Sequence, residues 1–223
     1  MRAAASCFGH RLCMDRIVPG GVSVDPSAAN LAALRAFLAT VSGDFEPLVR
    51  VYDNMASLQD RTVTTGIVRP ELVRRFGAGG HVGRASGRAF DARKTVGYAP
   101  YNTIDFPIPT LDAGDVNARV WIRVEEIRTS LGLLDRILGD LPAGPVSVPI
   151  PPGSGEGISL TEAFRGDVLI WLRLRDGLVE HCHARDASWF QWPLLEAAIE
   201  GNIVADFPLC NKSFNCSYSG HDL

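Results

Sequence analysis

Residues 115–138, DVNARVWIRVEEIRTSLGLLDRIL, constrain the fold more strongly than any other stretch of the chain. Their apolar side chains are spaced alternately four and three residues apart, which predicts a long helix with a bundle-type seam. That seam consists of Val120, Val124, Ile127, Leu131, Leu134 and Leu138. The charged residues of the opposite face are Arg119, Arg123, Glu126 and Arg136. We expect that face to be solvated, with a subunit interface as the alternative.

Further helices are expected on both sides of this stretch. Asp25-Pro26-Ser27 is typical of a helix start, and apolar residues at helical spacing follow it through Val41. That helix is expected to continue or restart as far as Met55, with Pro47 marking a kink or a second start. Residues 69–76 predict a short helix closed by Gly77, and residues 189–199 predict the last helix.

The second half of the chain carries the pattern of a small antiparallel sheet. Residues 141–157 are rich in Pro and Gly and separate a helical part, about 1–141, from a sheet and tail, about 155–223. Strands are expected over residues 158–164 and 167–174, and Asp176-Gly177 is a hairpin-type turn into a third strand at 178–183. The predicted fold is α+β and mainly helical, with bundle helices and a small antiparallel sheet.

Composition narrows the classes of partner and compartment. The 223 residues are 46% hydrophobic, enough for the core of one domain or one and a half. A net charge of -3 with scattered Arg residues argues against nucleic acid or an anionic membrane surface as a partner. No apolar run approaches the roughly 18 residues of a membrane span, so we expect a cytoplasmic protein. Because Phe8 and Leu12 need a packing partner at once, we also expect N-terminal sequence to be missing.

Two internal segments raise the question of a ligand. The glycine-rich residues 77–88 could cradle a phosphate, but they lack the spacing of known phosphate loops, so a tightly packed loop is favoured. His181-Cys182-His183 could ligate a metal, since both histidines share one face of a strand. No further ligand follows at a recognisable spacing, and polar residues at a strand edge are the favoured interpretation.

The C-terminal tail, residues 205–223, is rich in Cys, His, Asp and Ser, a composition that suggests a metal site. The five cysteines of the chain are an odd number, and no two are spaced Cys-x-x-Cys. Reduced thiols are therefore expected. Cys210 is interpreted as a small buried thiol.

Several motifs, taken in order, resemble a known family. They are Gly83-Arg84-Ala85-Ser86-Gly87, Tyr98-x-x-Tyr101, Asp105-Phe106-x-x-Pro109, Gly114-Asp115 with Arg119 and residues 123–127, and Glu162-Ala163-Phe164-Arg165-Gly166. The set resembles the large-subunit family shared by group 4 nickel–iron hydrogenases and complex I. Members include the large subunits of formate hydrogenlyase and hydrogenase-4 and the D subunit of NADH-quinone oxidoreductase. The resemblance covers nearly the whole chain.

The resemblance implies a peripheral subunit that sits beside an iron–sulfur subunit, on the cytoplasmic side of a membrane arm. Hydrogenases of this family hold nickel and iron with two Cys-x-x-Cys pairs, since soft thiolates suit these metals. Without gaps, the C-terminal ligand positions fall on Ser217 and Gly220, and Cys216 lies one place away. The N-terminal pair would precede Met1. We therefore expect no metal and no cofactor on this chain, with iron–sulfur clusters in the partner subunit.

Two candidate sites follow from the resemblance and from the tail. Arg165 matches the arginine that packs near the diatomic ligands of the hydrogenase cluster, while Phe164 replaces the usual proline. Arg165 could alternatively pair with Glu162 and brace the sheet. In the tail, His221 and Asp222 form a titratable pair able to pass a proton, with a solvated terminus as the alternative.

These features support one leading hypothesis and two alternatives. The chain is expected to be a subunit of a membrane-associated oxidoreductase complex without its own nickel–iron centre. It would contribute to electron or proton transfer, with quinone as a candidate acceptor and NAD(P)H as a candidate donor at the level of the complex. The first alternative is a non-catalytic scaffold for iron–sulfur partner subunits. The second is an active hydrogenase large subunit with unusual ligands.

Overall fold

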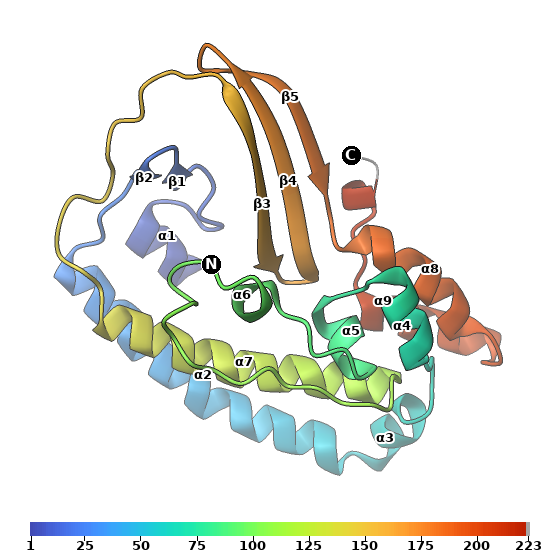
Figure 1. Ribbon diagram of the computed structural model, residues 1–223. Coiled ribbons are helices and arrows are strands. Elements are labelled where there is room, and N and C mark those ends of the chain that lie inside the picture. Colours follow the sequence, from blue (N-terminus) through green and yellow to red (C-terminus); the bar gives the residue numbers. More distant parts are fainter. Residues whose placement is uncertain (222–223) are drawn as a thin grey trace. The chain divides into compact units, whose positions relative to one another are not determined.

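The chain folds as a mainly helical α+β protein in the computed structural model, which describes residues 1–221 (Figure 1). The helices are α1 Arg2–Phe8, α2 Ala28–Asn54, α3 Ala56–Thr62, α4 Pro70–Phe76, α5 Gly80–Ala85, α6 Ala92–Thr95, α7 Val116–Gly139, α8 Ser188–Ile199 and α9 Phe207–Phe214. The strands are β1 Ile17–Val18, β2 Gly21–Val22, β3 Gly155–Ala163, β4 Gly166–Arg175 and β5 Leu178–Arg185. Short 3-10 turns cover Val204–Asp206 and Ser219–His221. The predicted fold class is confirmed.

Residues 1–51 and 128–152 form the first of two compact units. Within it, ion pairs join α2 to the C-terminal part of α7. Arg128 grips both carboxylate oxygens of Glu46, and Arg35 lies 2.9 Å from Asp135. The β1–β2 turn needs glycine at position 20, because φ is +88° and a Cβ there would lie 2.1 Å from the carbonyl oxygen of Val148.

The second unit comprises residues 52–127 and the chain from Gly153 onward. Its sheet is the antiparallel meander β3-β4-β5, drawn in orange in Figure 1. Ala163 pairs with Gly166 across the first hairpin, so Phe164 and Arg165 form the turn. The core beside this sheet combines α4, α5, α8 and α9, and its buried side chains include Val73, Val82, Leu194 and Phe214.

The structure confirms several predicted elements and corrects others. The helix over 115–138 is α7, and the hairpin at Asp176-Gly177 joins β4 to β5. Pro47 lies inside α2 without ending it, and Ser27 caps that helix through a 3.2 Å hydrogen bond from the amide of Asn30. The helix predicted to be the last, α8, is followed by α9 in the tail.

The expected orientation of α7 is only partly correct, because Val124 of the predicted seam is buried and Arg136 of the opposite face is exposed as expected. Arg119, assigned to a solvated face, has 0% of its surface exposed, whereas the predicted seam residues Ile127 and Leu134 are 40% and 43% exposed. Ile122 and Leu133, which lie outside the predicted seam, are buried as well. An arginine can be buried in this way only because other groups accept its hydrogen bonds.

Candidate functional site

Arg84, on α5, is the centre of a buried ionic cluster. Only 3% of its side chain is exposed. Its Nε donates a 2.7 Å hydrogen bond to Oε1 of Glu126, which Nη2 also contacts, and Nη1 donates to Oε1 of Glu162 at 2.9 Å. Asp91 lies 3.7 Å from Nη1. The negative charges of Glu126, Glu162 and Asp91 thus offset the cost of burying the positive charge of Arg84 in a low-dielectric interior.

The electrostatics of the cluster follow from burial and from these pairs. Burial alone would lower the pKa of Arg84, but Glu126, Glu162 and Asp91 raise it above its ordinary value. Burial raises the pKa of Glu162 against the opposing effect of Arg84. Burial also opposes ionisation of Asp91, yet its bonds to Arg93 lower the pKa of that carboxyl overall. The cluster therefore holds an ionised guanidinium and at least one firmly ionised carboxylate.

Motifs that are distant in the sequence converge on this cluster. The hydroxyl of Tyr98 accepts a 3.0 Å hydrogen bond from the backbone amide of Glu162. Tyr98 packs edge-on against Tyr101, and Tyr101 against Phe106. The backbone oxygen of Arg84 accepts from the amide of Leu111 at 2.8 Å. Residues from several of the ordered motifs therefore meet around the buried pair of Arg84 and Glu162.

Arg165 lies in the β3–β4 turn and is held through its backbone as well as its side chain. Its Nε donates to the carbonyl oxygen of Asn215, and its own carbonyl accepts from Nε2 of Gln191 at 2.6 Å. A Cβ at Gly80 would lie 2.0 Å from that same carbonyl oxygen, and φ there is +63°. Only glycine permits so close an approach of α5 to the turn.

The considered pairing of Arg165 with Glu162 is not the one the structure forms. Glu162 accepts from Arg84 and from the backbone amide of Ala92, while Arg165 bonds to Asn215. Within residues 1–221 the two side chains therefore serve different contacts. Arg165 links the sheet to the end of α9, and Glu162 belongs to the ionic cluster.

Arg119 anchors α9 from α7. Its Nε donates to Oγ of Ser213 at 2.9 Å, and its terminal nitrogens donate to the carbonyl oxygens of Gly114 and Gly66. The guanidinium carbon lies 4.5 Å from the ring centroid of Phe214. Burial lowers the pKa of Arg119 to about 10, so the group is still charged at neutral pH. Its hydrogen bonds fix the position from which the tail continues.

The two positions assigned to missing metal ligands form a local turn on α8. Oγ of Ser217 accepts from the amide of Gly220 at 2.9 Å, and the amide of Ser217 donates to Oγ of Ser188. The carbonyl oxygen of Gly220 accepts from Nε1 of Trp189 at 2.8 Å. A Cβ at Gly220 would lie 2.9 Å from Cγ of Asp186, so a larger residue requires a neighbour to shift.

These residues do not fit a nickel–iron centre. Gly220 has no side chain, and the Ser217 hydroxyl is a hard donor that is already engaged. Cys216 is buried, its thiol contacts Oε1 of Gln191 at 3.9 Å, and burial raises its pKa to about 11. It is therefore a protonated thiol at neutral pH. No group of three or more His, Cys, Asp or Glu residues in the described chain is placed to hold a metal.

Comparison with known proteins identifies the family. Residues 1–152 match the family described as respiratory-chain NADH dehydrogenase, 49 kDa subunit. The chain belongs to this family. The resemblance to the D subunit of complex I seen in the sequence is confirmed.

Two proteins named as a hydrogenase and a formate hydrogenlyase subunit are also similar to this chain. The carbon monoxide-induced hydrogenase of Rhodospirillum rubrum is 31% identical over 93% of this chain and 59% of the relative. Formate hydrogenlyase subunit 5 of Escherichia coli (strain K12) is 30% identical over 100% of this chain and 40% of the relative. The chain thus spans roughly two fifths to three fifths of the length of these relatives.

A solved structure shares the fold of this family member. A chain of the membrane-bound sulfane sulfur reductase, described as an archaeal respiratory membrane complex, aligns with a TM-score of 0.92 and 26% identity. The alignment covers 100% of this chain and 63% of that chain. No helix among residues 1–221 is both long and apolar enough to cross a membrane.

The tail of this 49 kDa family chain places one further predicted site residue. His221 is exposed, and its ring stands edge-on to Trp189 and Trp192, at 6.3 Å between centroids in each case. Tyr218 packs on Trp192 from the same turn. Asp222, the predicted partner of His221, lies outside the described residues. The proton-passing pair therefore stays a prediction.

The remaining ligand candidates have more ordinary surroundings. Residues 80–85 of the glycine-rich stretch are buried and helical, which agrees with tight packing. His181 and His183 are exposed on β5, and His183 stands edge-on to Trp189.

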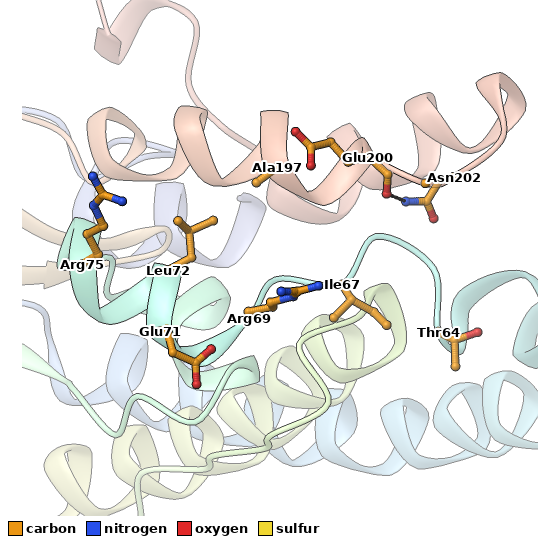
Figure 2. A pocket seen from close by; sticks show the side chains of 10 residues that line it. Thr64, Ile67, Arg69, Glu71, Leu72, Arg75, Ala197, Glu200 and Asn202 are labelled. Carbon is orange, nitrogen blue, oxygen red and sulfur yellow. Dashed lines mark hydrogen bonds between the residues drawn. The ribbon is translucent and has the colours of Figure 1, made fainter.

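A cleft of about 1010 Å³ lies along α4 and the end of α8, lined by polar residues such as Arg69, Glu71 and Glu200 (Figure 2). No predicted site residue lines it.

Sequence reasoning missed the roles of His81, Arg84 and Arg119. His81 is fully buried on α5, with Nε2 3.0 Å from Nη2 of Arg123. Burial, then Arg123 and Arg119, lower its pKa well below the ordinary value. For Arg84 the sequence did offer a signal, since it is a charged residue among the small side chains of Gly83-Arg84-Ala85-Ser86-Gly87. Small neighbours leave room for other side chains to approach the arginine.

Proposed function

We propose that this chain is a subunit of a membrane-associated oxidoreductase complex and holds no nickel–iron centre of its own. It contributes to electron or proton transfer beside an iron–sulfur subunit, peripherally on the cytoplasmic side of the membrane. Membership of the 49 kDa subunit family supports this role, as do relatives named as a hydrogenase and a formate hydrogenlyase subunit. Quinone is the proposed acceptor class, and NAD(P)H the donor class at the level of the complex.

One observation carries the metal-free part of the proposal. The positions that match the terminal ligands of family hydrogenases are Ser217 and Gly220, and they bond to each other and to α8 instead of presenting thiolates. The nearest thiol, Cys216, is buried and protonated at neutral pH. A donor set of this kind favours neither nickel nor iron.

The residues proposed to take part in transfer are Arg165, His221 and Asp222. Arg165 is fixed by Asn215 and Gln191, so its guanidinium has a defined position from which to stabilise negative charge on an electron acceptor. His221 is exposed on the tail, where an imidazole can take up and release protons. Neither role requires a metal on this chain.

A scaffold is the second candidate function. It is favoured by the number of purely structural contacts in the tail, where Ser217, Gly220 and Trp189 hold one another in place. In a scaffold these contacts would position the iron–sulfur partner subunit and perform no chemistry. Substitutions in the tail would then impair assembly before they impair turnover.

Variants of the complete complex separate the two functions. We expect Ser217→Ala with His221→Ala to leave the partner subunits co-purifying and to reduce donor-to-acceptor turnover by about tenfold or more, because proton delivery typically contributes about 100-fold or more. Arg165→Gln should act in the same direction. Exposed His181→Ala is the control, since it removes an imidazole from another surface. Normal turnover in all three variants would exclude the transfer role and leave the scaffold.

A further inference from the structure

Three nitrogen-rich side chains gather around Phe164 in the sheet-containing unit. The guanidinium carbons of Arg123 and Arg165 lie 5.8 Å and 5.9 Å from the centroid of the Phe164 ring. The His81 ring lies 6.4 Å from the same centroid. Arg123 comes from α7, Arg165 from the β3–β4 turn and His81 from α5. Phe164 is 62% exposed, Arg123 and Arg165 are half-buried and His81 is fully buried, so the group extends inward from the surface of this unit.

The hydrogen bonds of this group are incomplete. Nε2 of His81 lies 3.2 Å from the carbonyl oxygen of Ser213 and 3.0 Å from Nη2 of Arg123, but one nitrogen cannot both donate to the first and accept from the second. In either tautomer Nδ1 of His81 is buried and has no partner among the described residues. Nε of Arg123 is in the same state. Buried polar atoms of this kind are uncommon in folded proteins and call for an explanation.

The charges of the group are also incompletely balanced. Burial lowers the pKa of Arg123, and Arg165 adds to that effect while Glu126 opposes it. However, Oε1 of Glu126 is already the acceptor for two nitrogens of Arg84. In the described chain Arg165 hydrogen-bonds through its Nε alone, to a neutral carbonyl. Among the described residues, Arg123 therefore shares the charge of Glu126 with Arg84, and Arg165 hydrogen-bonds only to a neutral carbonyl.

We propose that Arg123 and Arg165, with His81 behind them, bind a small oxyanion of the kind carried by a carboxylate or a phosphate. A guanidinium presents its N–H groups in a planar fork that matches two oxygens of such a group. The oxyanion supplies the missing negative charge and acceptors for Arg123. With its proton on Nδ1, His81 adds a neutral donor. This inference uses only local charges and hydrogen bonds, so it holds independently of the proposed function.

Anion titration of the purified full-length chain tests the site. Isothermal titration with acetate, and separately with inorganic phosphate, at constant ionic strength should give one binding site in the wild-type chain. Arg123→Gln and Arg165→Gln should each weaken binding roughly tenfold, because each removes a charge-assisted hydrogen bond. Arg173→Gln removes the same charge from an exposed strand position paired with Glu156, and should bind like the wild type.

The probes also identify the ligand class. Binding of both anions supports a general oxyanion site, whereas acetate alone or phosphate alone assigns a carboxylate or a phosphate group. Lack of a site in the wild type, or equal affinity in all four proteins, would overturn the proposal. Near-ultraviolet circular dichroism verifies folding. If Arg123→Gln does not fold, Arg123→Lys keeps the charge without the fork, and Arg165→Gln tests the exposed turn independently.

Discussion

Arg84 and Glu162 lie 78 residues apart in the chain, yet Nη1 of the arginine donates a 2.9 Å hydrogen bond to Oε1 of the glutamate. Their side chains are 3% and 5% exposed. This pair joins α5 to the end of β3, the strand that leads into the turn carrying Arg165. The buried pair therefore ties the strand that leads into the Arg165 turn to α5.

Breaking this pair should destabilise the protein strongly. Glu162→Gln leaves Arg84 with less compensation in a buried site, so we expect the free energy of unfolding to fall by about 3 kcal/mol. Urea unfolding followed by circular dichroism measures this loss. The control is Glu156→Gln, which removes an exposed partner of Arg173 and should cost less than about 1 kcal/mol. Equal effects of the two substitutions would refute the structural role of the cluster.

The close approach of α5 to the Arg165 turn gives a second prediction. Gly80→Ala should lower the free energy of unfolding by more than about 2 kcal/mol, since the new Cβ would meet the Arg165 carbonyl oxygen at 2.0 Å and φ is +63°. Gly132→Ala is the matched control. Gly132 lies within α7, and a Cβ there would have no neighbour within 4 Å, so alanine should stabilise the helix by about 0.5–1 kcal/mol. Comparable losses at both positions would contradict this packing.

The buried imidazole of His81 predicts a pH dependence. Its pKa is lowered well below 6.5 by burial, Arg123 and Arg119 in the folded state. The contribution of the neutral His81 imidazole to the free energy of unfolding is therefore fully present above pH 6.5. This contribution is lost as the pH falls below 6.5, because the imidazole binds a proton in the unfolded chain but not in the folded chain.

Unfolding measured between pH 6.5 and 5 provides the test. The free energy of unfolding of the wild type should decrease by up to about 1.4 kcal/mol per pH unit relative to His81→Gln. The comparison between the two proteins removes the contributions of carboxylates that titrate in both. Parallel curves for wild type and His81→Gln would show that the imidazole is not held neutral by the fold.

Restoring cysteines at the terminal ligand positions should not restore a metal site. Ser217→Cys with Gly220→Cys removes the acceptor of the Gly220 amide and places a Cβ 2.9 Å from Cγ of Asp186. We expect a loss of about 1–3 kcal/mol in stability and no stoichiometric nickel. Ser217→Cys alone should cost less, because it leaves Gly220 unchanged. Nickel is quantified in both variants after expression in cells grown with added nickel. Stoichiometric nickel in either variant would contradict this prediction.

Local patterns predicted much of the fold, while long-range contacts decided the site. The periodicity of α7 and the Asp176-Gly177 turn act over a few residues and are visible in the sequence. The burial of Arg119 depends on carbonyl oxygens of Gly66 and Gly114, which only the folded chain brings near it. Helix α9 was missed, although Pro208 in its first turn is a start signal and Asn215 closes it with φ +55°.

The family resemblance singled out Arg165, but it did not predict the contacts that this residue makes in the structure. Arg165 could be assigned to the β3–β4 turn from sequence, but its bond to Asn215 could not, because the tail returns to the turn from 50 residues away. His81 carried no sequence signal at all. Its neighbours Arg123 and Ser213 come from other elements, so its burial and its low pKa emerge only from tertiary packing.

Nickel content of the purified complex tests the central claim most directly. The complex is isolated through a tag on this chain from cells grown with nickel, and nickel is quantified per chain alongside the iron of the partner clusters. A hydrogenase large subunit prepared in parallel provides the positive control. Far less than one nickel per chain, with partner iron present, is the predicted result. About one nickel per chain, lost on substitution of Cys216 or Cys210, would contradict the absence of a nickel–iron centre.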